Sequence, residues 1–126
     1  MSYAEEWARC RPWIEKALRR CGGTHDIEDI ERGLSLHLYQ FWPGAHVAVV
    51  TEVNQYPKMA VLNCFLIGGD SNEALVELVT EIEPRIAHFA RNAGCNRITG
   101  IGRQGFRKVF EGAGYTPRWF VIAKDL

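Results

Sequence analysis

The stretch that decides the fold reads Lys58-Met59-Ala60-Val61-Leu62-Asn63-Cys64-Phe65-Leu66-Ile67, followed by Gly68-Gly69-Asp70-Ser71. Residues 58–67 are apolar at both odd and even positions, which is typical of a strand covered on both faces. The two glycines then mark a turn, and apolar residues at spacings of three and four predict a helix over 72–93. A doubly covered strand followed by a helix predicts a sheet with helices on both sides.

Upstream of this stretch the sequence predicts two strands and two helices. Residues 34–42 and 45–53 are rich in β-branched, aromatic and leucine residues, and turn signals at Pro43-Gly44 and 54–57 separate the strands. A helical stripe predicts a helix over 12–21 with Pro12 in its first turn. A second helix is predicted over 26–33, capped by Thr24 or Asp26.

Downstream, Pro84 is expected to kink or split the helix over 72–93. A strand over 97–101, a helix over 103–112 and a last strand over 118–123 follow. The predicted order is α-α-β-β-β-α-β-α-β. This order indicates an α/β protein with a mixed, mostly antiparallel sheet and helices on both faces.

Length and charge limit the possible functions. The chain has 126 residues, with no repeat or linker, which predicts one domain over 1–126. Fifteen basic and fifteen acidic residues balance, whereas proteins that bind nucleic acid usually carry a basic surplus. The longest nearly apolar run, 59–67, is far below the roughly 20 residues that span a bilayer. We therefore expect no nucleic acid or membrane partner, and a cytoplasmic location.

Cysteines and histidines give no sign of a metal site or a disulfide framework. Neither residue type shows ligand-type spacing, and the cysteines form no C-x-x-C pair. We expect reduced thiols and no metal. The residues concerned are Cys10, Cys21, Cys64, Cys95, His25, His37, His46 and His88.

Residues 100–105 match the dinucleotide-binding pattern G-x-G-x-x-G between a predicted strand and a predicted helix. Only 21 residues follow Gly105, which is too few for the remaining strands of a mononucleotide-binding half. Glycines at a tight strand-to-helix turn explain the match instead.

The loop Gly68-Gly69-Asp70-Ser71 has two interpretations. Backbone N–H groups at the start of a helix could bind a phosphate, and the glycines would let it approach the main chain. Alternatively the loop is only a tight turn before a capped helix, because Asp70 adds a negative charge. Glu52 on the second strand is likewise either a general base or a surface carboxylate.

The element order, together with the segments Gly94-Cys95-Asn96-Arg97-Ile98 and Gly112-Ala113-Gly114-Tyr115, resembles the GNAT superfamily of acyl-CoA N-acyltransferases. The resemblance implies that acetyl-CoA binds where two strands splay apart, along Phe65 and Leu66. Its pyrophosphate would lie over Gly68, Gly69, Asp70 and Ser71. Trp42-Pro43-Gly44, Thr51-Glu52 and Gly68-Gly69-Asp70 look like small GNAT-like proteins of phages and prophages.

The sequence departs from the family pattern at two places. The pyrophosphate loop lacks the family's R/Q-x-x-G-x-G/A pattern, and Phe110 stands where many members carry the tyrosine that acts as general acid. A phenyl ring donates no proton, so Tyr115 or Tyr56 would have to replace it.

Two functions stay open. One is an acetyl-CoA-dependent N-acetyltransferase with Glu52 as base and Tyr115 as acid. The other is a non-catalytic GNAT fold that serves as an interaction or assembly module, for instance in a phage particle. The second function predicts a protein partner or self-association through an aromatic surface around Trp42. That surface comprises Tyr39, Phe41, Trp42 and Trp119.

Overall fold

The computed structural model describes residues 1–101 and 104–126. Its described part forms one four-stranded sheet in the order β1-β2-β3-β4. Neighbouring strands are antiparallel except for β3 and β4, which are parallel. The predicted mixed, mostly antiparallel sheet is confirmed. The strands are β1 (Tyr39–Pro43), β2 (Val47–Gln55), β3 (Ala60–Gly69) and β4 (Arg97–Gly100).

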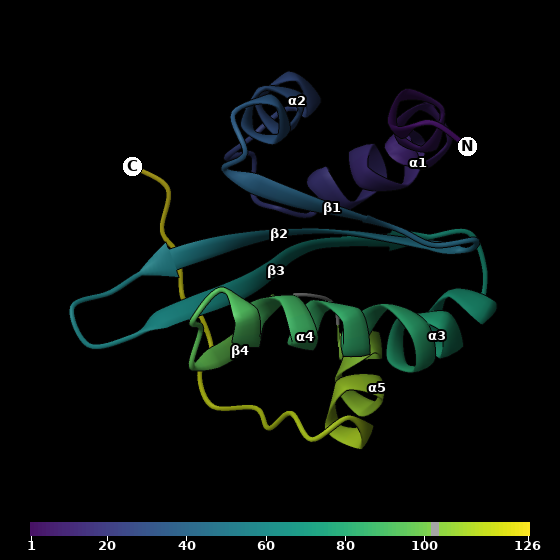
Figure 1. Ribbon diagram of the computed structural model, residues 1–126. Coiled ribbons are helices and arrows are strands. Elements are labelled where there is room, and N and C mark those ends of the chain that lie inside the picture. Colours follow the sequence, from purple (N-terminus) through teal and green to yellow (C-terminus); the bar gives the residue numbers. More distant parts are fainter. Residues whose placement is uncertain (102–103) are drawn as a thin grey trace.

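Helices cover both faces of the sheet, as predicted (Figure 1). One face, which we call the α1–α2 face, lies under α1 (Tyr3–Leu18) and α2 (Ile27–Ser35). The other, the α4 face, lies under α5 (Arg107–Gly112) and a long helical segment that ends in α4 (Glu83–Asn92). Two hydrophobic clusters, one on each face, make up the core. The described part of the chain contains no helix long and apolar enough to cross a membrane.

Helix α1 begins at Tyr3, well before the predicted start at residue 12. The Ser2 hydroxyl caps it by accepting the N–H of Glu5 at 3.2 Å. Pro12 therefore lies inside the helix, where it removes the hydrogen bond to the carbonyl of Ala8. Both residues are exposed, so water can reach that carbonyl. Four buried side chains keep the helix continuous across the proline: Trp7, Cys10, Ile14 and Leu18.

The helical segment after β3 is not split at Pro84, and a π-helical turn lies immediately before α4. It comprises α3 (Glu73–Glu77), the π-helical turn η1 (Leu78–Ile82) and α4 (Glu83–Asn92). Pro84 lies in the first turn of α4, where a missing N–H has no helical partner to lose. The widened turn thus places the proline at a helix start and not in a helix interior.

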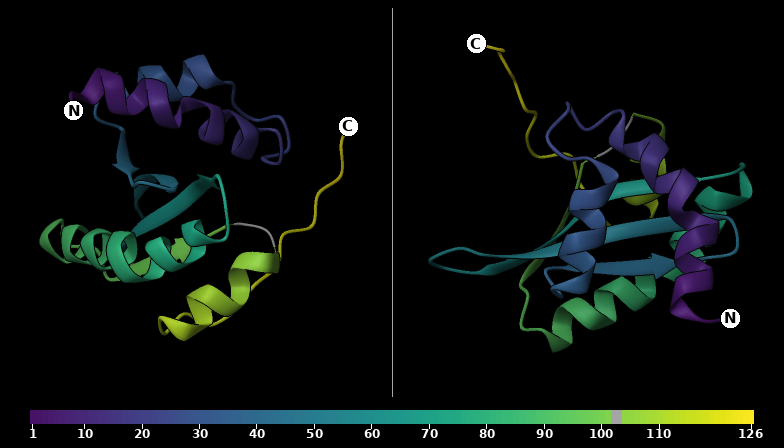
Figure 2. Two further views of the ribbon diagram at one scale, coloured as in Figure 1. Left: turned by 90° about the vertical axis from the view of Figure 1, so that its right-hand side faces the viewer. Right: turned by 90° about the horizontal axis from the view of Figure 1, so that it is seen from above.

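The predicted strand over 118–123 is absent, so the predicted order is wrong in its last element. The chain after α5 crosses the sheet on its β4 side and does not run along β4 (Figures 1 and 2). Strand propensity needs a pairing partner to produce a strand, and this path offers none. The segment has no regular structure and is exposed throughout. A short 3₁₀ turn, η2 (Gln104–Phe106), precedes α5.

Candidate functional site

Strands β3 and β4 diverge near the middle of β3. Their pairing runs from Val61↔Arg97 to Cys64↔Gly100, and the N–H of Ile101 still donates to the Cys64 carbonyl at 3.3 Å. Beyond that point β3 continues to Gly69 beside β2 alone. At the same level β3 carries a bulge: Val50 pairs with Leu66 and Thr51 with Cys64, which leaves Phe65 as the extra residue.

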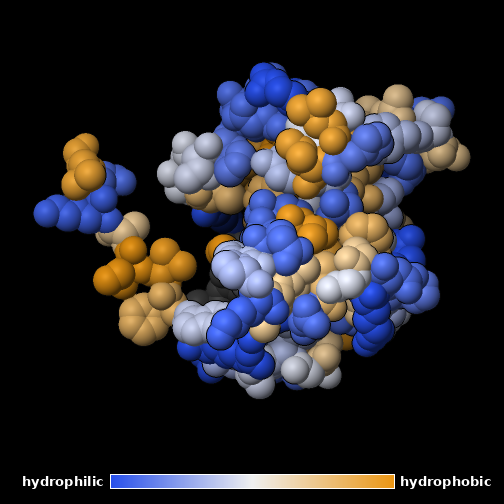
Figure 3. Space-filling model, turned by 60° about the vertical axis from the view of Figure 1, so that its left-hand side comes forward, coloured by the Kyte–Doolittle hydropathy of each residue, from blue (hydrophilic) through white to orange (hydrophobic). Residues whose placement is uncertain are grey.

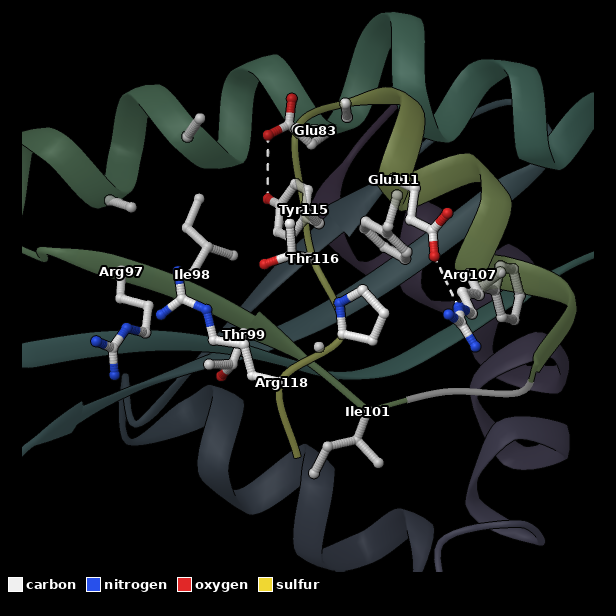
Figure 4. A pocket seen from close by; sticks show the side chains of 18 of the residues that line it. Glu83, Arg97, Ile98, Thr99, Ile101, Arg107, Glu111, Tyr115, Thr116 and Arg118 are labelled. Atoms are coloured by element: carbon white, nitrogen blue, oxygen red, sulfur yellow. Dashed lines mark hydrogen bonds and ion pairs between the residues drawn. The ribbon is translucent and has the colours of Figure 1, made fainter. Parts of the chain in front are cut away.

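A cavity of about 930 Å³ opens beside this divergence, between α4, β4, α5 and the chain that follows α5 (Figure 4). Its walls mix apolar surface with charge. Within the described residues, four arginines and two glutamates line it, so the local charge is positive. The charged residues are Arg91, Arg97, Arg107, Arg118, Glu83 and Glu111. Arg107 donates to Glu111 at 2.7 Å, whereas Arg97 and Arg118 lie against the ring of Trp119.

Tyr115 points into this cavity, and its hydroxyl donates to Oε1 of Glu83 at 3.0 Å (Figure 4). Burial, and secondarily the Glu83 carboxylate, raises the pKa of Tyr115 far above its ordinary value of 10.0. The phenol therefore stays protonated at neutral pH. Burial also raises the pKa of the nearby Cys64 thiol to about 12, which keeps that thiol neutral. Phe110 packs edge-on against the Tyr115 ring, with centroids 5.1 Å apart.

Glu52 lies on the opposite side of the sheet. Its neighbour Thr51 accepts the indole N–H of Trp42 at 2.9 Å, and Trp42 packs on the α4 face. Because successive strand residues point to opposite faces, Glu52 points to the α1–α2 face. There it accepts the side-chain amide of Asn63 at 3.2 Å, and Asn63 accepts the hydroxyl of Thr99 at 3.0 Å. A polar row thus crosses β2, β3 and β4.

The two predicted catalytic residues are therefore on different faces but at the same level of the sheet. Glu52 bonds to Asn63, and the charge of Glu83, the partner of Tyr115, acts on Cys64. Asn63 and Cys64 are consecutive residues at the end of the β3–β4 pairing.

A second pocket, of about 370 Å³, lies on the α1–α2 face beside Tyr39. Tyr39 is the register partner of Glu52, and burial followed by the Glu52 charge raises the pKa of its phenol. His25, another lining residue, packs near the bulge residue Phe65 at 5.9 Å between ring centroids. Tyr39 thus lines this pocket and is paired with Glu52, which does not itself line the pocket.

The predicted cofactor residues on β3 are packed against the protein itself. Phe65 and Leu66 point into the cluster under α1 and α2. A Cβ on Gly68 would collide with the main-chain oxygen of Trp13, and one on Gly69 would meet Ala74 at 2.5 Å. These glycines are required for close packing within the chain.

The rest of the loop is acidic. Asp70 accepts from the hydroxyl of Ser71 at 2.9 Å and lies 3.2 Å from Nδ1 of His46. These contacts, with the Ser71 hydrogen bond first, lower the pKa of Asp70. Ser71 also lies 2.7 Å from the carboxylate of Glu73, and the Asp70 N–H is already used by the carbonyl of His46. The placement favours the tight-turn interpretation, while binding of pyrophosphate at this loop stays a prediction.

Several residues of the site escaped the sequence analysis. Glu83 and Arg91 both lie on α4, whereas the other cavity arginines come from β4, α5 and the chain beyond α5, so only the fold brings these segments together. Tyr56, the other candidate acid, is 52% exposed in the β2–β3 turn and does not line the cavity. The G-x-G-x-x-G match includes Gly102 and Arg103, which lie outside the described residues.

No group of His, Cys, Asp and Glu in the described ranges could hold a metal ion. The four cysteines are free thiols at separate positions. Of the aromatic surface predicted around Trp42, three members have partners inside the molecule. Phe41 packs against Trp7, Tyr39 against Phe65, and Trp42 against Phe89. Only Trp119 of that set is largely exposed, at 70%.

Comparison with solved structures identifies the fold. A probable acetyltransferase superimposes with a TM-score of 0.67 at 13% identity, over 100% of this chain and 97% of that one. A GNAT family acetyltransferase of Staphylococcus aureus gives 0.62 at 10% identity, over 100% and 95%. The wild-type protein TTHA1254 of Thermus thermophilus gives 0.57 at 15% identity, over 91% and 94%.

The chain therefore has the GNAT acetyltransferase fold, as the sequence resemblance implied. No model of a known protein family matches the sequence, and no curated protein matches it significantly. The likeness to phage proteins receives no support from these comparisons. At these low identities the structural likeness concerns the fold alone, so the activity has to be argued from the site.

Proposed function

We propose that the protein is an N-acyltransferase that uses acetyl-CoA or a related coenzyme A thioester. The observation that carries this proposal is the divergence of β3 and β4 beyond Cys64 and Gly100, with the cavity at its mouth. The resemblance to GNAT enzymes implies that the donor binds at such a divergence. A polar row with a carboxylate lies on one side of it, and a protonated phenol lies on the other.

The cavity fits the donor better than the glycine loop does. Its volume of about 930 Å³ is within the usual range of roughly 300–1,000 Å³ for small-molecule and cofactor sites. Its surplus of arginines suits the phosphate groups of coenzyme A. At the loop of Gly68 to Ser71, by contrast, the space beside the two glycines is already occupied by other atoms of the chain. The side chains there include the carboxylates of Asp70 and Glu73. We therefore expect the phosphates to contact the cavity arginines.

The chain's own residues can move the two protons that amide formation requires. A bound coenzyme A thioester would supply an activated acyl group and a thiolate leaving group. Glu52 would accept the proton of the acceptor amine on the α1–α2 face, where the pocket beside Tyr39 offers room for the acceptor. On the α4 face Tyr115, which is protonated at neutral pH, would exchange its hydrogen bond to Glu83 for one to the thiolate and donate its proton there. Glu83 orients the Tyr115 hydroxyl.

The test is a calorimetric titration with acetyl-CoA, followed by an assay of thiol release with a panel of amines. We expect saturable binding and transfer. Glu52→Gln and Tyr115→Phe should each lower transfer by about 10²–10⁴-fold, the usual contribution of a general acid or base, with donor affinity unchanged. Glu81→Gln, an exposed carboxylate outside the site, is the matched control and should behave as wild type.

The same titration separates the alternative function. A non-catalytic interaction module, in a phage particle or elsewhere, requires no acetyl-CoA binding. If acetyl-CoA binds, the affinity of the Asp70→Asn variant shows where the phosphates of the donor lie. Removal of this charge should tighten binding appreciably if the pyrophosphate lies over the loop, and should change it little if the cavity arginines hold it. Gly69→Arg is unsuitable for this purpose, because the new side chain would collide with Ala74 and the His46 carbonyl.

A further inference from the structure

The chain beyond Arg118 forms an arm that projects from the body of the protein (Figure 3). Four consecutive large apolar residues form its middle. Their exposed fractions are 70% for Trp119, 86% for Phe120, 81% for Val121 and 85% for Ile122. Isolated exposed apolar residues are ordinary on soluble proteins, but a contiguous run of this kind marks an interaction surface. All four residue types also favour β-strands.

The sheet offers a matching site. Strand β4 is the last strand in the sheet order, and its hydrogen bonds within the described residues go to β3. Half of its main-chain donors and acceptors therefore face outward, which is the template that a further strand pairs with. An apolar segment of high β-propensity and an edge of β4 with no strand of the described residues paired to it are thus present in the same chain.

The course of the arm does not suit pairing with its own β4. The hydroxyl of Tyr115 is fixed to Glu83 on α4, and the N–H of Tyr115 is fixed to the Phe110 carbonyl. Pro117 follows two residues later and restricts the turn. From there the arm crosses the β4 side of the sheet from the α5 layer toward the α2 layer and then leaves the body (Figures 1 and 2). Trp119 keeps a contact with Arg97 of β4, whereas the residues from Phe120 to Ile122 are more than 80% exposed.

The area of the arm is sufficient for a dimer. Trp and Phe each present about 150–250 Å², so at these exposures the two rings of one arm expose roughly 300 Å². Two exchanged arms and the surface that they cover then amount to roughly 1,200 Å², the lower bound for a stable interface. Val121 and Ile122 add to this area. The formal net charge of +0 means that two copies do not repel each other over long range.

We propose that the arm over 118–123 pairs as an edge strand with β4 of a second copy of this chain, and that the two copies exchange arms. The exchange is reciprocal about a twofold axis, so each copy gives one strand and receives one. Both open edges and both apolar arms become covered in the same step. This interface includes only Trp119 of the aromatic surface predicted around Trp42, and it does not depend on the acyltransferase proposal.

The experiment combines sedimentation with hydrogen exchange on the full chain across a wide range of protein concentration. We expect a dimer, with amide protection in 97–100 and 118–123 that increases as the dimer forms. Val121→Glu places a charge in the pairing segment at a position that is 81% exposed in the monomer, and it should yield a monomer with an unchanged circular dichroism spectrum. Val76→Glu on α3, an exposed valine elsewhere, is the matched control and should remain dimeric.

Three results would overturn the proposal. One is a wild-type protein that stays monomeric at every concentration. Another is a dimer that persists in Val121→Glu, which would place the interface elsewhere, for example around Trp42. The third is arm protection that does not change with concentration, which would mean that the arm pairs with β4 of its own chain.

Discussion

At the residue scale, Glu77 connects the long helical segment to the turn between β1 and β2. Its carboxylate accepts three consecutive main-chain N–H groups, those of Ala45, His46 and Val47, at 2.7, 2.8 and 2.9 Å. Hydrogen bonds to a charged group are about twice as strong as neutral ones. The turn, which the sequence marks only by Pro43-Gly44, is therefore closed by a residue thirty positions away.

We predict that Glu77→Ala lowers the free energy of unfolding by about 2–3 kcal/mol, because it leaves these N–H groups without their charged partner. Chemical denaturation of both proteins measures the change. Glu81→Ala, one turn further along and exposed, should change stability by less than about 0.5 kcal/mol. Equal effects of the two substitutions would show that the three hydrogen bonds contribute nothing specific.

Tyr115 predicts a pH dependence of stability. In the unfolded chain the phenol titrates near its ordinary pKa of 10.0, whereas burial and Glu83 raise its pKa in the folded protein. Below pH 10 both states hold the proton, so its contribution to stability is fully present. As pH increases above 10, the unfolded state releases the proton first, and the contribution is lost. Wild type should therefore lose stability above pH 10 more steeply than Tyr115→Phe. Parallel denaturation curves at alkaline pH would contradict this prediction.

At the element scale, α1 contains a correctable defect. Pro12 lies inside the helix and is exposed, and a proline there is about 3 kcal/mol less favourable than alanine. Pro12→Ala should therefore raise the melting temperature, with a gain of about 1–3 kcal/mol. Pro84→Ala is the matched control, because Pro84 lies in the first turn of α4 and loses no helical hydrogen bond. If both substitutions have the same effect, the position of the proline in its helix is not what matters.

The contact between α1 and β3 gives a second element-scale prediction. A methyl group on Gly68 would collide with the main-chain oxygen of Trp13, which is backbone and moves only with the helix. Gly68→Ala should therefore destabilise the protein by about 1–3 kcal/mol. Gly112 in α5 has open space around its Cβ position, so Gly112→Ala should be neutral or stabilise by up to about 1 kcal/mol. Denaturation of the three proteins compares them.

The elements also show which features could be predicted from the sequence. The strand over 58–67 could be predicted because a strand that is covered on both faces has an apolar side chain at nearly every position. This pattern is local and can be seen in the sequence. Pro12 misled the prediction of α1, because burial of Trp7 and Cys10 outweighs one lost hydrogen bond. The prediction of a strand over 118–123 was wrong because a strand needs the edge of another strand to pair with. The composition of the segment does not reveal the path that the chain takes. Tyr115 was found through the family resemblance, but its partner Glu83 could be found only from the fold.

At the scale of the whole molecule, charge is balanced in total but not in its distribution. The cavity is lined by four arginines and two glutamates among the described residues, while the loop at Asp70 lies next to Glu73. Arg91, Arg97 and Arg118 form no ion pair within the part of the chain that the structure describes. A polyanionic donor should therefore be attracted to the cavity in spite of the zero net charge.

This distribution predicts how acetyl-CoA binding depends on salt and on single charges. The dissociation constant should increase with ionic strength, because salt screens the exposed arginines. Arg97→Gln should weaken binding and flatten the salt dependence, since it removes one positive charge from the cavity wall. Arg20→Gln changes the net charge by the same amount, at an exposed arginine just beyond the end of α1. It should alter neither the affinity nor its salt dependence. Calorimetric titrations at several salt concentrations measure both quantities. If Arg97→Gln and Arg20→Gln gave identical affinities and salt slopes, the phosphates would lie outside the cavity, and the loop at Gly68 to Ser71 would be the remaining place for them.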